Sequence, residues 1–166
     1  MRKPAPPRSR PAGPRPAPAA PRPGEGKRGE AGYLGYLLRQ AGAAYRLRME
    51  RALSDLGVTP PQFAVLTMLA AYPGLSNADL ARLALLTPQT VSVIVANLER
   101  AGALARRPHA SHGRVKHLDV TPAGRKLLAR CRQRVQATER RLAAGLSPAE
   151  ERAVRRWLVA VAVASG

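Results

Sequence analysis

Helix-start signals recur along this chain and constrain its fold more than any other feature. A threonine or serine stands directly before a proline at Thr59-Pro60, Thr87-Pro88, Thr121-Pro122 and Ser147-Pro148. The hydroxyl can accept a hydrogen bond from an unpaired amide of the first turn, and proline has no amide to leave unpaired there. Gln62 and Glu150 complete two capping boxes. The chain is therefore predicted to be mainly helical.

The spacing of apolar residues and the stop signals predict the bounds of the elements. A first helix is expected over 32–56, ended by Gly57. Later helices are expected over 60–72, 76–85, 87–101, 122–144 and 148–163, the second of these capped by Ser76. Between Gly102 and Thr121 the helical period is lost, and two short strands over 104–107 and 116–120 are expected to form a hairpin around a polar turn.

The order helix, turn, helix, hairpin is typical of a winged helix-turn-helix. The predicted fold class is mainly α with a small β-hairpin. A winged helix-turn-helix DNA-binding domain is expected over 59–121, and a helical dimerisation region over 32–58 and 122–164. Residues 1–31 are rich in proline and basic residues and lack apolar periodicity, so they are predicted to be a disordered basic tail. Such a tail could touch DNA phosphates or be a plain solvated extension.

The charge points to a polyanionic partner. The chain has 28 Lys+Arg against 10 Asp+Glu, a formal net charge of +18. Nucleic acid is the first expectation and an anionic membrane surface the second. An arginine-rich genome bias could explain part of the excess, but not the scarcity of acids. No apolar run approaches the ~20 residues that a membrane helix needs, and no secretory signal is recognisable.

The helix predicted over 87–101 has two unlike faces. Val91, Ile94, Leu98 and Ala101 form a stripe that is expected to pack on the preceding helix through Leu80, Leu83 and Ala84. The opposite face carries short polar groups, which suit a major groove because Gln and Asn can pair with adenine. For an isolated helix, plain solvation would explain this face better. The flanking elements and the charge favour DNA recognition.

Several short motifs make a family resemblance specific. They are QFAVL at 62–66, LA at 80–81, TPQTV at 87–91, LERAG at 98–102 and VTPAGR at 120–125. Together they resemble the multiple antibiotic resistance regulator (MarR) family over about residues 33–163. The resemblance implies a homodimeric repressor that reads a palindromic operator in double-stranded DNA. It also implies a wing against the minor groove and, in many members, release of DNA by a small aromatic ligand.

The residues expected to contact DNA combine the helix caps, the polar face and the wing. They are Ser76, Thr87, Gln89, Thr90, Ser92, Val93, Asn97 and Arg114. Two departures from the family pattern stand out. The wing reads His112-Gly113-Arg114 where relatives usually have an Asp that holds the Arg. Relatives often have basic residues at the positions of Val93 and Asn97, so backbone contacts and apolar fit are expected to contribute more here.

Dimerisation is also expected from two apolar stripes outside the winged region. One runs along 122–144 through Leu127, Leu128, Cys131, Val135, Thr138 and Leu142. The other comprises Val154, Trp157, Leu158 and Val161 on the last helix. The first helix is expected to cover part of these stripes and a second subunit the rest.

Other candidate sites are weaker. Cys131 is the only cysteine, which excludes a disulfide within the chain, suggests a reducing cytoplasmic setting and fits a small core residue. His109, His112 and His117 suggest zinc, but their spacing across a loop favours solvent or phosphate contacts, and no metal or other cofactor is expected. Tyr33, Tyr36, Tyr45, Phe63 and Tyr72 could line a ligand pocket or simply be core residues.

No enzyme signature is present: no carboxylate pair, Ser/His/Asp set or Gly-rich phosphate loop stands out. The main alternative to a sequence-specific regulator is a non-sequence-specific DNA-coating or architectural protein, supported by the basic tail and the altered wing. A winged helix that only docks proteins is disfavoured by the charge.

Overall fold

The computed structural model describes residues 20–108 and 116–163. The chain divides into two compact units, residues 1–42 and 43–166. The described part of the first unit holds a single 3-10 turn, η1 (Gly26–Arg28), and the start of helix α1 (Leu34–Leu53). Disorder was predicted for residues 1–31, of which residues 1–19 lie outside the described residues. In the described remainder, backbone hydrogen bonds connect residues between 22 and 32.

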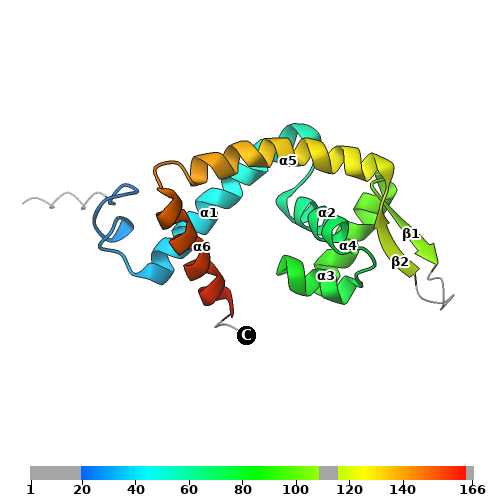
Figure 1. Ribbon diagram of the computed structural model, residues 1–166, viewed down its shortest axis with the longest axis horizontal. Helices are drawn as coiled ribbons and strands as arrows, with labels where there is room; N and C mark the ends of the chain where they lie inside the picture. The colour runs from blue at the N-terminus through cyan, green and yellow to red at the C-terminus, as the bar shows by residue number, and fades with distance from the viewer. Residues whose placement is uncertain (1–19, 109–115, 164–166) are drawn as a thin grey trace, which may run out of the picture. The chain divides into compact units, whose positions relative to one another are not determined.

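The second unit contains the remaining elements, and their bounds agree with the sequence prediction to within a few residues (Figure 1). After the second half of α1 come η2 (Ser54–Leu56), α2 (Pro60–Ala71), α3 (Asn77–Ala84) and α4 (Pro88–Arg100). Strands β1 (Leu104–Pro108) and β2 (Lys116–Val120) follow, then α5 (Pro122–Leu142) and α6 (Pro148–Val163). The strands pair antiparallel, with Leu104 opposite Val120.

The predicted caps form as expected. Thr59 and Ser76 each make a full capping box, with Gln62 and Asp79 respectively. Thr87 accepts a hydrogen bond from the Thr90 amide, and Thr121 accepts one from the Gly124 amide. These contacts fix where α2, α3, α4 and α5 begin, because each satisfies an amide that the helix itself leaves unpaired.

The main core lies within the winged helix-turn-helix. It joins buried apolar side chains of α2, α3 and α4 to Leu104, Leu118 and Val120 of the hairpin and to Leu128 of α5. Val91, Ile94 and Leu98 are buried as the stripe predicts, and Val95 is buried as well. Leu83, expected to meet this stripe, is 47% exposed, and Ala101 is also exposed. The stripe is therefore centred nearer Val95 than expected.

A second, smaller core joins the later half of α1 to α5. Met49, Leu53, Val58, Cys131 and Val135 are buried together, with Phe63 packed against both cores. As expected, α1 covers part of the α5 stripe: Cys131 and Val135 pack against it, while Leu128 lies in the main core, so these three residues need no partner. Cys131 is fully buried, and burial raises the pKa of its thiol.

Helix α6 keeps its apolar side chains exposed. Val154, Trp157 and Leu158 are each about 40% exposed, and no residue of α6 is buried. In the described residues, no single helix has both the length and the apolar character to cross a membrane. Only α3 and α4 taken together meet those criteria, and they are bent by 108° and bury apolar residues in the main core.

Candidate nucleic-acid interface

The first turn of α4 has the features of a helix N-terminus that binds an anion. Pro88 stands at the first helical position, Thr87 caps the helix, and the turn contains no acidic residue. The Thr87 oxygen lies 3.2 Å from the Thr90 amide nitrogen, and the two threonine hydroxyl oxygens are 2.9 Å apart. The remaining amides and the helix dipole leave this end positive, which favours phosphate.

The outer face of α4 is exposed where sequence analysis expected contacts with bases. Gln89, Thr90 and Ser92 are exposed and Val93 is 60% exposed. The Gln89 side chain has no hydrogen-bond partner within the described residues. Its amide can therefore pair with a base edge without first breaking an internal bond.

Ser92 and Asn97 lie on the same face, but their polar atoms already have partners. The Ser92 hydroxyl donates to the Pro88 carbonyl oxygen at 2.9 Å and accepts from the Asn77 side-chain amide at 3.4 Å. Asn97 is half-buried and accepts from Arg100 at 2.9 Å. Ser92 thus fastens α3 to α4. Asn77 was not singled out from the sequence, because its partner lies 15 residues away.

Ser76 is placed at the start of α3, as expected. Its hydroxyl donates to an Asp79 carboxylate oxygen at 2.6 Å and accepts from the Asp79 amide at 3.2 Å. These bonds, together with the ion pair from Arg82, hold the pKa of Asp79 below its usual range. Asp79 stays ionised, so any phosphate near this helix start would meet a negative charge as well as the cap.

The hairpin is fastened to the helices at three places. Arg106 of β1 forms a two-point ion pair with Glu99 of α4, and His117 Nδ1 lies 2.9 Å from the Gly74 carbonyl oxygen in the α2–α3 turn. At its base, the Thr121 hydroxyl donates to the Gly102 carbonyl oxygen at 2.6 Å. The wing stem therefore cannot swing independently of α4.

The wing tip, with His109, His112 and Arg114, lies outside the described residues. The third histidine of the suggested zinc set, His117, sits on β2 against Gly74. In the parts of the chain that the structure describes, no group of three or more potential metal-ligating side chains comes together. The residues that the sequence did not single out, Asn77, Glu99 and Arg106, all connect elements. His117, for which solvent or phosphate contacts were expected, connects the hairpin to the α2–α3 turn instead.

Comparison with known proteins identifies the family of this arrangement. The model of the MarR family matches residues 56–115. The HTH-type transcriptional repressor Rv2887 of Mycobacterium tuberculosis is 43% identical over 125 residues, which are 75% of this chain and 90% of the relative. Its crystal structure with salicylic acid has a TM-score of 0.66 at 41% identity and covers 80% of this chain and 98% of that one.

The crystal structure of the same M. tuberculosis protein in complex with DNA has a TM-score of 0.63 at 40% identity. It covers 78% of this chain and 97% of that chain. Both the sequence match and the structural match extend beyond the winged helix-turn-helix into the flanking helices. The chain described here belongs to the MarR family of transcriptional regulators.

Proposed function

We propose that this chain is a sequence-specific DNA-binding repressor that acts as a homodimer and responds to a small aromatic ligand. The observation that carries the proposal is the outer face of α4, where Gln89, Thr90 and Val93 are exposed. The helix is held on one side by Asn77 and on the other by Arg106. A rigidly held helix with exposed polar groups can enter a major groove with little loss of conformational entropy.

This placement assigns a separate role to each part of the chain. Residues 59–121 form the DNA-binding domain, and 32–58 with 122–164 form the dimerisation region. Gln89, Thr90 and Val93 face base edges. The amides at the start of α4, beside the Thr87 cap, face phosphates. Ser76 caps the start of α3, where the ionised Asp79 weakens attraction for a phosphate. Ser92 and Asn97 shape the helix face, and Arg114 belongs to the minor-groove contact of the wing. No catalytic role is proposed, and the site of action is the cytoplasm.

The relatives support a DNA partner and an aromatic ligand. The M. tuberculosis protein has been crystallised with DNA, with salicylic acid and with p-aminosalicylic acid. A benzoate-type acid is therefore the ligand class to test first with this chain. The architectural alternative lacks a comparable argument, since an α4 face suited to base recognition has no use in uniform coating of DNA.

Footprinting on the promoter DNA beside the coding region of this chain tests the proposal. A discrete protected palindrome is expected, and salicylate is expected to reduce the protection. Uniform coverage of the duplex at all protein concentrations would instead support the architectural alternative.

The exposed stripe of α6 supports the homodimer. Val154, Trp157 and Leu158 share one face of the helix, and a second subunit that covers it would remove apolar surface from water. Leu158→Asp should convert the dimer to a monomer, because it places an unpaired charge in that contact. Val159→Asp, on the opposite face, is the matched control. Sedimentation that shows a stable wild-type monomer at micromolar concentration would contradict the dimer.

A further inference from the structure

Two open cavities follow the seam between the later half of α1 and α5. The first, about 300 Å³, is lined by Leu56 at the end of η2 and by Arg130, Gln133, Arg134 and Ala137 of α5. The second, about 590 Å³, is lined by Arg48, Arg51 and Ala52 of α1 and by Thr138 and Arg141 of α5. Helix α5 lines both cavities, and the segment opposite it is η2 in the first cavity and α1 in the second. We call Arg48, Arg51, Arg130, Arg134 and Arg141 the arginine seam.

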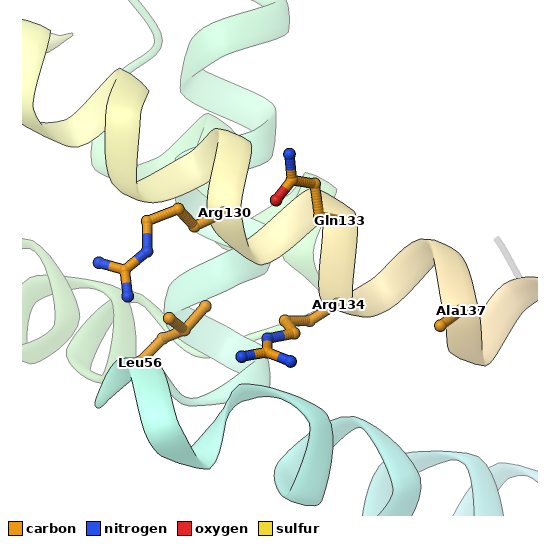
Figure 2. A pocket seen from close by; sticks show the side chains of 5 residues that line it. All are labelled: Leu56, Arg130, Gln133, Arg134 and Ala137. Atoms are coloured by element: carbon orange, nitrogen blue, oxygen red, sulfur yellow. The ribbon is translucent and has the colours of Figure 1, made fainter.

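Figure 2 shows how the first cavity is arranged. Arg130 and Arg134 project from α5 toward the turn that carries Leu56, so their guanidinium groups lie at the cavity. Gln133 and Ala137 complete the lining from the same helix. In the second cavity the arginines come from both helices, and the Thr138 side chain adds a hydroxyl. Both cavities are therefore surrounded by hydrogen-bond donors.

The acids of these helices are already paired. Over residues 43–58 and 122–142 the chain has three, Glu50, Asp55 and Glu139. Glu50 pairs with Arg46 at 3.3 Å, Asp55 with Arg134 at 2.6 Å, and Glu139 accepts the Tyr45 hydroxyl at 2.6 Å.

Four members of the seam therefore keep an unneutralised charge. Among the described residues, Arg48, Arg51, Arg130 and Arg141 have no carboxylate within ion-pair distance. Positive charges without a carboxylate partner attract an anion that enters the cavity. The rigid fork of arginine matches the oxygens of phosphate, often through two parallel hydrogen bonds.

We propose that the arginine seam binds a small molecule that carries at least two linked phosphate groups. A diphosphate supplies several negative charges in a small volume, which suits the second cavity, where Arg48, Arg51 and Arg141 line one space together with Thr138. A single carboxylate would neutralise only one of the four. The site lies on α1 and α5, outside the winged helix-turn-helix, so its occupancy does not depend on whether α4 reads DNA.

Titration calorimetry of the full chain with inorganic pyrophosphate tests this site directly. The salt concentration is about 0.15 M, where the Debye length of about 8 Å screens diffuse attraction. Pyrophosphate should bind at least about tenfold more tightly than orthophosphate, since it can engage more of the charge-assisted bonds. Absence of pyrophosphate binding, or equal affinity for both anions, would overturn the proposal.

Two double variants that remove the same amount of positive charge distinguish a specific binding site from a general attraction of this basic chain for anions. The double variant Arg48→Gln with Arg141→Gln removes one seam arginine from each helix. The control double variant Arg132→Gln with Arg140→Gln removes the same charge from exposed positions of α5 that line neither cavity. The seam variant should lose at least about tenfold in pyrophosphate affinity, because charge-assisted bonds are lost, and the control should change by less than about twofold.

Circular dichroism and thermal melting verify that both variants fold, which is expected because all four residues are exposed. An equal loss of affinity in both variants would show that only net charge matters and would refute the site. Stoichiometric displacement of pyrophosphate from the wild-type chain by a random DNA duplex, together with weaker duplex binding by the seam variant than by the control variant, would instead assign the seam to the DNA backbone and overturn the proposal.

Discussion

Arg106 of strand β1 and Glu99 of helix α4 form a two-point ion pair, with 2.8 Å between Nε and Oε1 and 3.3 Å between Nη2 and Oε2. The two residues come from the two elements that we propose to face DNA, helix α4 and the wing. The pair fixes the angle between them and takes Arg106 out of the set of cations available to phosphates. Because Arg106 is a cation in the wing, its position in the sequence is also compatible with a phosphate contact.

Glu99→Gln should loosen the wing and release Arg106. We expect a loss of about 0.5–1 kcal/mol in the free energy of unfolding, because both side chains are partly exposed and solvent weakens the pair. Affinity for random duplex should rise as a cation is released. Urea denaturation and anisotropy titrations measure the two effects. A double-mutant cycle with Arg106→Gln that shows no coupling would contradict the role given to this pair.

Gln89→Ala should lower affinity for the operator and leave random DNA nearly unaffected. The amide of Gln89 is exposed and is proposed to pair with a base, so its loss should cost about 1–3 kcal/mol on the specific site. Titrations of operator and scrambled duplex at fixed salt measure both. Equal losses on the two duplexes would mean that α4 does not read bases.

Gly124→Ala should destabilise the winged domain. A Cβ at Gly124 would lie 2.1 Å from the Ala103 carbonyl oxygen, a backbone atom where the hairpin meets α5. Such overpacking costs about 1–3 kcal/mol or more, because the hairpin base must move. Gly42→Ala is the matched control: it lies within α1 and meets nothing within 4 Å. Thermal melting should show a clear loss for the first variant and no loss for the second.

Tyr45 links α1 to α5 in a pH-dependent way. Burial and the hydrogen bond to Glu139 raise the pKa of its phenol to about 12. Folding therefore favours the neutral phenol. The stabilisation is present below the usual tyrosine pKa near 10 and is lost as pH rises from about 10 through 12.

Tyr45→Phe is the test of this link. Ultraviolet titration of the folded protein should lose its highest-pH tyrosine step in the variant. The variant should also be less stable near neutral pH, by under about 1 kcal/mol because the site is partly exposed, and that difference should shrink at high pH. A stability difference that stays constant across the range would show that the hydrogen bond is not its cause.

The sequence by itself determined the elements and the face of α4. Capping and apolar periodicity act between residues three to four apart, so Thr87-Pro88 and Ser76 located two helix starts without any tertiary information. The same local rules identified Val91, Ile94 and Leu98 as core and Gln89 as outward-facing. The family motifs are also local, and the matches to known proteins confirm the family that they indicated.

Only the tertiary structure decided how these elements are joined. The stripe of α5 was expected to be shared between α1 and a partner subunit, and only the structure shows that Cys131 and Val135 are among the residues that α1 covers. The hydroxyl of Ser92 was expected to contact DNA, and it is engaged by Asn77. The pairing of Arg106 with Glu99 was not expected from the sequence at all. The arginine seam brings together residues about 90 positions apart. Such contacts depend on how helices pack, and no local pattern in the sequence encodes that geometry.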